Sequence, residues 1–220
     1  IFVIYIIAFF VIFFWAAYEQ AGASLTLFAA EQTDRTIFGW EMPASWIQSF
    51  NPFFVVILAA IMPSVWGALN KRGMEPASPT KQAIGLLLLS LGYLVICFGV
   101  KDVQPGVKVS LIWLTGLYFI HTMGEIALSP IGLSMVNKLT PVRFASLMMG
   151  IWYLSTSTAN KFAGTLGGLY PEDGKVKTLL GFRIETMFDF FMVFVIMSGV
   201  ASLILFLLSK KLQKMMHGVE

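Results

Sequence analysis

Six stretches of the sequence are apolar over about 20 residues, which is the length that an α-helix needs to cross the hydrocarbon core of a bilayer. No segment has the alternating pattern of a membrane barrel, and none predicts a strand. Because a helix satisfies its own backbone hydrogen bonds in lipid, we expect an all-α membrane protein with six transmembrane helices. The expected spans are Ile1 to about Ala30, a second within Met42 to Asn70, Gln82 to Val100, Val109 to about Asn137, Phe144 to about Gly167, and Phe188 to Ser209.

The composition agrees with a membrane protein. Hydrophobic residues make up 57% of the chain and charged residues 12%, and the mean hydropathy is +0.79. Soluble domains carry about 25% charged residues. The basic residues lie between the apolar runs and form no stripe, so the net charge of +3 predicts no nucleic-acid partner. The first span starts at Ile1 without a Met or the basic flank of a signal peptide, so we interpret the chain as a piece of a longer protein.

The loops differ in charge. One set of loops carries eight Lys or Arg residues and two acidic residues. The other set carries six Lys or Arg residues and eight acidic residues. The set richer in Lys and Arg is expected to be cytoplasmic, with both termini inside. Its basic residues are Lys71, Arg72, Lys81, Lys138, Arg143, Lys210, Lys211 and Lys214.

Two carboxylates stand out because they lie inside apolar runs. Glu19 follows eighteen residues without a formal charge, and Glu125 follows sixteen. An ionised carboxylate in hydrocarbon costs several kcal/mol, so such groups usually face a partner or a watery cavity. Trp15 is four residues before Glu19 and is expected on the same helix face. The alternative for Glu19 is a solvated position near the outer interface.

Other polar residues have two interpretations each. His121 and Ser129 flank Glu125 at helical spacing; His121 is either a proton relay or, as we favour, a hydrogen-bonded core residue. Asn51 precedes Pro52, so it either caps a helix or lies two turns inside one and needs a partner. Lys161 is either near the outer end of its span, as we favour, where its stem can reach the interface, or a buried partner for Glu19 or Glu125.

Prolines and glycines mark bends and close contacts. Pro63, and Pro130 five residues after Glu125, should kink their helices, as in transporters that place kinked helices beside a central site. Glycines recur every seven residues in the third span, and a small-xxx-small pair occurs in the fifth, so we expect close helix packing at Gly85, Gly92, Gly99, Gly164 and Gly168.

Nothing predicts an enzyme or a metal site. The chain has one cysteine, Cys97, in mid-span, and two histidines, without metal-ligand spacing or a phosphate loop. Ser129 and His121 are two helical turns apart and are poorly placed for a nucleophile and its base.

Several motifs together resemble the proton-dependent oligopeptide transporters, the POT or PTR family. The tenth-helix signature of that family is similar to Gly124-Glu125-Ile126-Ala127-Leu128-Ser129-Pro130-Ile131-Gly132-Leu133-Ser134. The seventh helix resembles residues 14–20 and 24–29, the start of the eighth resembles residues 51–54, and the eleventh resembles residues 141–144, 147–150, 152–156 and 160. The resemblance covers nearly the whole chain in order. It implies that residues 1–220 are family helices seven to twelve, the C-terminal half of a major facilitator fold, without the N-terminal six-helix bundle.

The resemblance also implies roles. Glu125 would hold the amino terminus of a small peptide together with Asn51, and Glu19 would belong to the proton-coupling network. Three further residues match positions that line the pocket: Trp15, Trp152 and Ser155.

The implied function is uptake of di- and tripeptides with protons across the inner membrane by alternating access. Protons would be the coupling ion, with no other cofactor, and the partners would be peptides, the N-terminal bundle and the lipid bilayer. The alternatives are a transporter of the same fold for nitrate or an organic anion, and a non-transporting membrane scaffold. Two departures leave the proton route open: Tyr18 stands where many members have a second acid, and Ala159 precedes Asn160 where Gly is usual.

Overall fold

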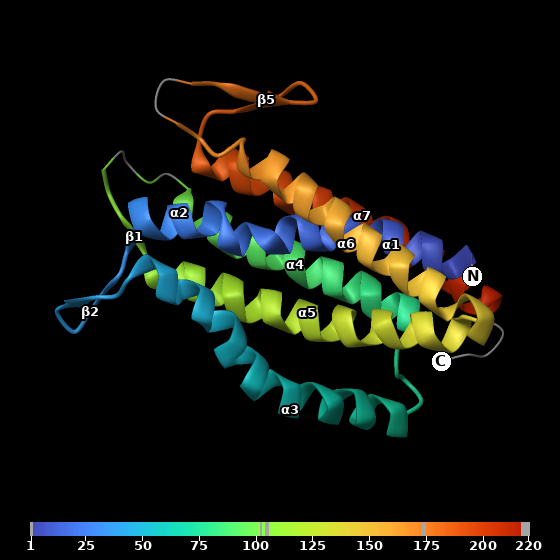
Figure 1. Ribbon diagram of the computed structural model, residues 1–220. Helices are drawn as coiled ribbons and strands as arrows, with labels where there is room; N and C mark the ends of the chain where they lie inside the picture. The colour runs from blue at the N-terminus through green and yellow to red at the C-terminus, as the bar shows by residue number, and fades with distance from the viewer. Residues whose placement is uncertain (1, 102, 104–105, 173–174, 217–220) are drawn as a thin grey trace.

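The computed structural model describes residues 2–101, 103, 106–172 and 175–216. Ile1, where the first span was expected to begin, lies outside the described residues. Within them the chain folds into long helices that run side by side, with the two ends of the chain at the same end of the bundle (Figure 1). The long helices are α1 (Phe2–Tyr18), continued by α2 (Ser24–Glu31), α3 (Phe50–Lys71), α4 (Ser78–Val100), α5 (Leu111–Leu139), α6 (Ala145–Gly167) and α7 (Met187–Met215).

In the described part of the chain, five helical segments are long and apolar enough to cross a membrane. They correspond to five of the six expected spans. The remaining one, the fifth expected span, is α6, which has 23 residues, as many as α4, but is less apolar. The reason is its run of polar side chains between Ser155 and Lys161.

The first expected span is not one continuous helix. The α-helix stops at Tyr18, a 3₁₀ turn follows (η1, Glu19–Gly22), and α2 begins at Ser24. Two carbonyls left without helical partners by this break accept side-chain hydrogen bonds, Ala16 from Gln20 Nε2 at 3.1 Å and Ala17 from Tyr93 Oη at 2.7 Å. The break is therefore satisfied inside the bundle rather than by water.

The prediction that no strands form was wrong in detail. Short strands occur in the loops: β1 (Thr33–Asp34) pairs in parallel with β4 (Val109–Ser110), and two antiparallel hairpins form. Figure 1 shows them away from the termini. The hairpin strands are β2 (Thr36–Ile37) with β3 (Trp40–Glu41), and β5 (Lys177–Leu179) with β6 (Phe182–Ile184). The strands are only two or three residues long, so they cannot be recognised from the pattern of apolar residues.

The core lies where α4 packs against α5 and α7, while α1 packs against α6. Glycines in α4 allow this approach. A Cβ built on Gly92 would lie 2.3 Å from His121 Cδ2, and one on Gly99 would lie 2.5 Å from Trp113. The expectation of close packing at Gly164 was wrong, because no atom lies within 4 Å of a Cβ there, and Gly168 approaches only carbonyls of its own segment.

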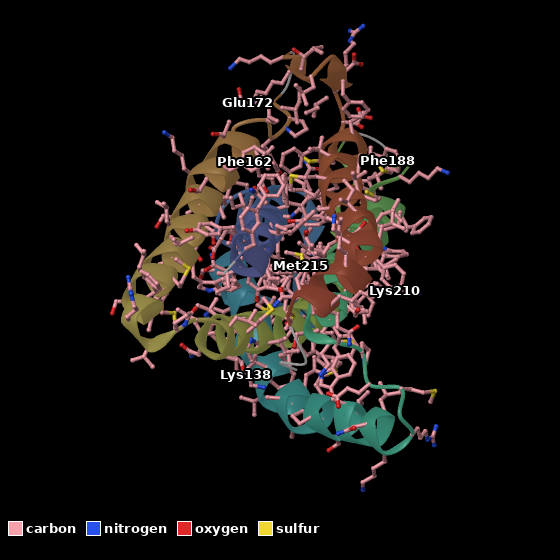
Figure 2. All side chains as sticks on the ribbon, turned by 90° about the vertical axis from the view of Figure 1, so that its right-hand side faces the viewer. Lys138, Phe162, Glu172, Phe188, Lys210 and Met215 are labelled. Atoms are coloured by element: carbon pink, nitrogen blue, oxygen red, sulfur yellow. The ribbon has the colours of Figure 1, made fainter. Side chains whose placement is uncertain are left out.

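Helix α3 diverges from the other helices (Figures 1 and 2). It follows a 3₁₀ segment (η2, Ala44–Ser49) and buries only Leu58 and Met62. Its main packing partner is α5. Pro52 lies in the first turn, where the missing N–H costs no helical hydrogen bond, while Pro63 lies in the interior. Because α3 buries only two residues, most of its surface is not covered by the other helices of this chain.

Candidate functional site

Three helices bring polar side chains together around Glu125. Tyr18, at the end of α1, donates from Oη to Glu125 Oε2 at 2.5 Å. Asn51, in the first turn of α3, donates from Nδ2 to the same oxygen at 2.8 Å and also to Tyr18 Oη. A third acceptor for Nδ2 is Thr122 Oγ1 at 3.2 Å. These four residues are called the Glu125 cluster below.

Local structure explains how each member reaches the cluster. The α1 helix ends at Tyr18, and its ring stacks on Phe14 with centroids 5.5 Å apart. Thr122 lies three residues before Glu125 in α5, so both side chains point the same way. Asn51 was expected either as a cap or two turns inside a helix. It is the second residue of α3 behind η2, and its amide has the protein partners that a buried amide needs.

Glu125 has no cationic partner in the part of the chain that the structure describes. Among the described residues, no Lys or Arg forms an ion pair with it; its hydrogen-bond donors are a phenol and an amide. Both donors are neutral and both bind Oε2. The half-buried carboxylate is thus oriented through one of its two oxygens by neutral donors.

Glu19 lies outside this cluster. It is exposed on η1, and within the described residues it has neither an ion pair nor a side-chain hydrogen bond. Its neighbour Gln20 points inward instead, donating to Ala163 O of α6 at 2.9 Å and accepting from Ser24 Oγ at 2.7 Å. The 3₁₀ turn therefore places the carboxylate outside and the amide inside. Trp15 is half-buried and packs edge-on against Tyr18, with ring centroids 5.3 Å apart.

The other two expected pocket residues lie on α6 and are buried. Trp152 packs against Gly132, where a Cβ would lie 2.4 Å from Trp152 Cη2. Ser155 Oγ donates to the carbonyl of Trp152 at 2.6 Å. The structure brings Asn51 into hydrogen-bond contact with Glu125, whereas no hydrogen bond among the described residues joins Trp152 or Ser155 to the Glu125 cluster.

His121 lies in the core, as the favoured interpretation has it. Its ring is 3% exposed, and Nε2 lies 3.1 Å from Leu89 O. Lys161 is exposed and takes part in none of the ion pairs of the described residues.

Two cavities lie at the ends of the bundle, away from Glu125. One of about 570 Å³ lies between the end of α3, the start of α4 and the C-terminal part of α5, and its lining includes Asn70, Lys81 and Pro130. The other, of about 900 Å³, lies between α2, the end of α6 and the segment that leads into β5. There Tyr170 Oη donates to Glu31 Oε2 at 3.2 Å, and burial together with that carboxylate raises the pKa of the Tyr170 phenol.

Two members of the Glu125 cluster, Tyr18 and Thr122, were not predicted as site residues. Tyr18 was identified only as a departure from the family pattern, and no role was predicted for Thr122. Only their closeness to the two carboxylates in the sequence could have suggested a role, since Tyr18 adjoins Glu19 and Thr122 lies one helical turn before Glu125.

The fold and the polar cluster define the class of protein: a membrane bundle with the architecture of one half of a major facilitator transporter. A family model described as "PTR2: POT family" matches residues 1–179. The chain therefore belongs to the POT family, which places it with transporters and not with enzymes.

The similarity to individual relatives supports the same family. The chain is 39% identical over 163 residues to the peptide transporter YePEPT of Yersinia enterocolitica, covering 73% of this chain and 32% of the relative. It is 30% identical over 204 residues to dipeptide and tripeptide permease A of Escherichia coli, covering 93% and 40%. The chain thus spans about a third to two-fifths of the length of these relatives.

Solved structures show the same fold. A crystal structure of peptide transporter POT in complex with alafosfalin superimposes with a TM-score of 0.83 at 32% identity, covering 98% of this chain and 42% of that one. A POT family transporter in complex with 5-aminolevulinic acid gives 0.76 at 28% identity, covering 96% and 40%.

Proposed function

We propose that this chain forms the C-terminal half of a proton-coupled transporter of di- and tripeptides, with Glu125 as the residue that binds the peptide ammonium group. The supporting observation is the Glu125 cluster: a carboxylate inside a membrane bundle, held by neutral donors and with no cationic partner among the described residues. Relatives and structural neighbours described as peptide transporters support the substrate class.

The attraction between Glu125 and an ammonium group is strong because the site is partly shielded from water. Asn51 keeps the carboxylate oriented and adds an amide oxygen for the ligand. Trp15, Trp152 and Ser155 remain proposed pocket residues; Trp15 is half-buried, whereas Trp152 and Ser155 are buried within this bundle. Helix α3 buries little within this chain, which leaves surface for that N-terminal bundle and for lipid.

The test is Glu125→Gln in the intact protein, reconstituted in proteoliposomes. A hydrogen bond to a charged group contributes about 1.5–3 kcal/mol, so dipeptide affinity should fall about 10- to 100-fold. The matched control is Glu185→Gln, an exposed carboxylate in the loop before α7, whose pairing with Arg183 contributes little. Unchanged dipeptide affinity in Glu125→Gln would remove Glu125 from the site.

For proton coupling we propose Glu19. Its exposure on η1 supports a partner outside this chain, and a carboxylate that alternates between a proton and an ion pair links protonation to conformation. Glu19→Gln should abolish uphill, proton-driven accumulation and retain some peptide exchange. Undiminished accumulation against a gradient would show that the coupling proton binds elsewhere.

Two other functions are separated by further measurements. A transporter of nitrate or an organic anion would be inhibited by those anions and not by dipeptides. A scaffold would keep both carboxylates away from water, so cysteines introduced at positions 19 and 125 would not react with a water-soluble thiol reagent. The native Cys97 is buried and gives little background.

For the orientation we propose both ends of the chain on the cytoplasmic side of the inner membrane. The loops richer in Lys and Arg, and the position of both chain ends at one end of the bundle, support this (Figure 1).

A further inference from the structure

The geometry points to Tyr18 as a specificity-determining residue: its phenol oxygen is a third acceptor for the ligand's ammonium group and favours a primary ammonium over a methylated one. This inference rests on the proposed function of the Glu125 cluster and deepens it.

The first step is the state of the Tyr18 hydroxyl. It donates its single proton to Glu125 Oε2 and accepts one hydrogen bond from Asn51 Nδ2. A hydroxyl oxygen has two lone pairs, so one remains available. The amide orientation of Asn51 follows from chemistry, because a carboxylate only accepts and the NH₂ group must therefore face it.

The second step is the number of free acceptors. Within the described residues, Oε1 of Glu125 and Oδ1 of Asn51 accept no hydrogen bond, while the donors of the cluster converge on Oε2. Three oxygens on α1, α3 and α5 therefore keep acceptor capacity: Tyr18 Oη, Asn51 Oδ1 and the second carboxylate oxygen of Glu125, Oε1. A primary ammonium group has three N–H donors and can use all three, whereas a secondary ammonium group has two.

The third step is that the Tyr18 oxygen is held in position. Its ring stacks on Phe14 at an interplanar angle of 17° and packs edge-on against Trp15. The break that follows is fixed by the hydrogen bonds of Gln20 to Ala16 and Ala163. A positioned acceptor discriminates between ligands, because little entropy is lost when the ligand binds.

Tyr18 also differs from an acidic residue in what it contributes to the site. Where many family members have a second carboxylate, a phenol supplies an acceptor without a second negative charge. The charge that attracts the ligand remains on Glu125, and Tyr18 sets how many N–H groups the site can satisfy.

The experiment compares alanyl-alanine with its N-methyl derivative on the purified intact protein, by calorimetric titration at one pH. Both ligands are cationic, and they differ by one N–H. The variants are Tyr18→Phe, which removes only the phenol oxygen, and the control Tyr5→Phe, an exposed tyrosine in the same helix. The quantity of interest is the ratio of the two affinities in each protein.

We expect the wild type to prefer alanyl-alanine by about tenfold, the scale of one hydrogen bond to a charged group. Tyr18→Phe should weaken alanyl-alanine binding by about tenfold and change N-methyl-alanyl-alanine binding by less than about twofold, which removes the preference. Tyr5→Phe should behave as the wild type. Retained binding of the methylated ligand also shows that the variant is folded.

The outcomes separate the two claims. A wild type that binds neither ligand overturns the proposed function and this inference with it. A wild type that binds both, with the full preference retained in Tyr18→Phe, overturns the inference alone. Equal weakening of both ligands in Tyr18→Phe does the same, because it shows that Tyr18 only supports the fold of the site.

Discussion

The contact between Gly85 of α4 and Gly124 of α5 connects helix packing to the site, because Gly124 directly precedes Glu125. A Cβ on Gly85 would lie 2.8 Å from Leu128 Cβ and 2.9 Å from Gly124 O. The reverse contact is equally tight, since a Cβ on Gly124 would lie 2.9 Å from Gly85 O. The two backbones therefore touch at the level of the carboxylate.

Gly85→Ala should both destabilise the protein and weaken ligand binding. Ordinary van der Waals contact begins near 3.4 Å, so the helices must separate by about half an ångström. The obstructing atoms are a backbone oxygen and a Cβ, which cannot rotate away. Overpacking of this kind costs about 1–3 kcal/mol. The same movement of α5 strains the hydrogen bonds of Glu125, and a loss of about 1 kcal/mol there corresponds to about fivefold weaker dipeptide binding.

The control is Gly116→Ala, in α5 and facing the same helix. A Cβ at Gly116 would lie 3.4 Å from Val95 Cγ1, an ordinary contact, and Ala favours the helix by up to about 1 kcal/mol. The assay is the apparent melting temperature of the purified protein, followed by dipeptide titration. We expect a fall of several degrees for Gly85→Ala and no fall for Gly116→Ala. Equal melting temperatures for Gly85→Ala and the wild type, or an equal loss in both variants, would refute the argument.

Two buried tyrosines should respond in opposite ways to loss of the hydroxyl. Tyr93→Phe removes the hydrogen bond to Ala17 O and leaves that buried carbonyl without a donor, so the apparent melting temperature should fall by an amount equivalent to about 1–3 kcal/mol. Tyr118→Phe removes a buried hydroxyl that has no hydrogen-bond partner among the described residues, so the melting temperature should stay the same or rise. The same thermal unfolding scan measures both, and a larger loss for Tyr118→Phe than for Tyr93→Phe would contradict this account.

The helix positions could be predicted from the sequence because a span in lipid has a minimum length and tolerates few charges. The fifth span, expected from Phe144 to Gly167, is α6 at Ala145–Gly167. The sixth was expected to end at Ser209 but continues to Met215, since a helix can extend beyond the apolar region with its Lys residues in water.

The break after Tyr18 could not be predicted in the same way. The residues before and after the break are apolar enough that hydropathy predicts one span over Phe2–Glu31 and does not indicate where the α-helix stops. What permits the break is a pair of side chains that satisfy the carbonyls of Ala16 and Ala17, and one of these, Tyr93, is 76 residues distant along the chain. A single sequence carries no signal for such a long-range hydrogen bond.

The same limit explains why two carboxylates with the same sequence signal have different surroundings. Both Glu19 and Glu125 interrupt apolar runs, yet Glu125 lies among donors from α1 and α3, while Glu19 is exposed on a 3₁₀ turn. The turn explains the difference, because it ends α1 at Tyr18 and directs Tyr18, rather than the next residue, toward Glu125. Among the described residues, Glu125 therefore accepts hydrogen bonds from neutral donors, and Glu19 has no hydrogen-bond or ion-pair partner. The two roles proposed above, ligand binding for Glu125 and proton coupling for Glu19, rest on this difference, which the interruption of the first helix produces.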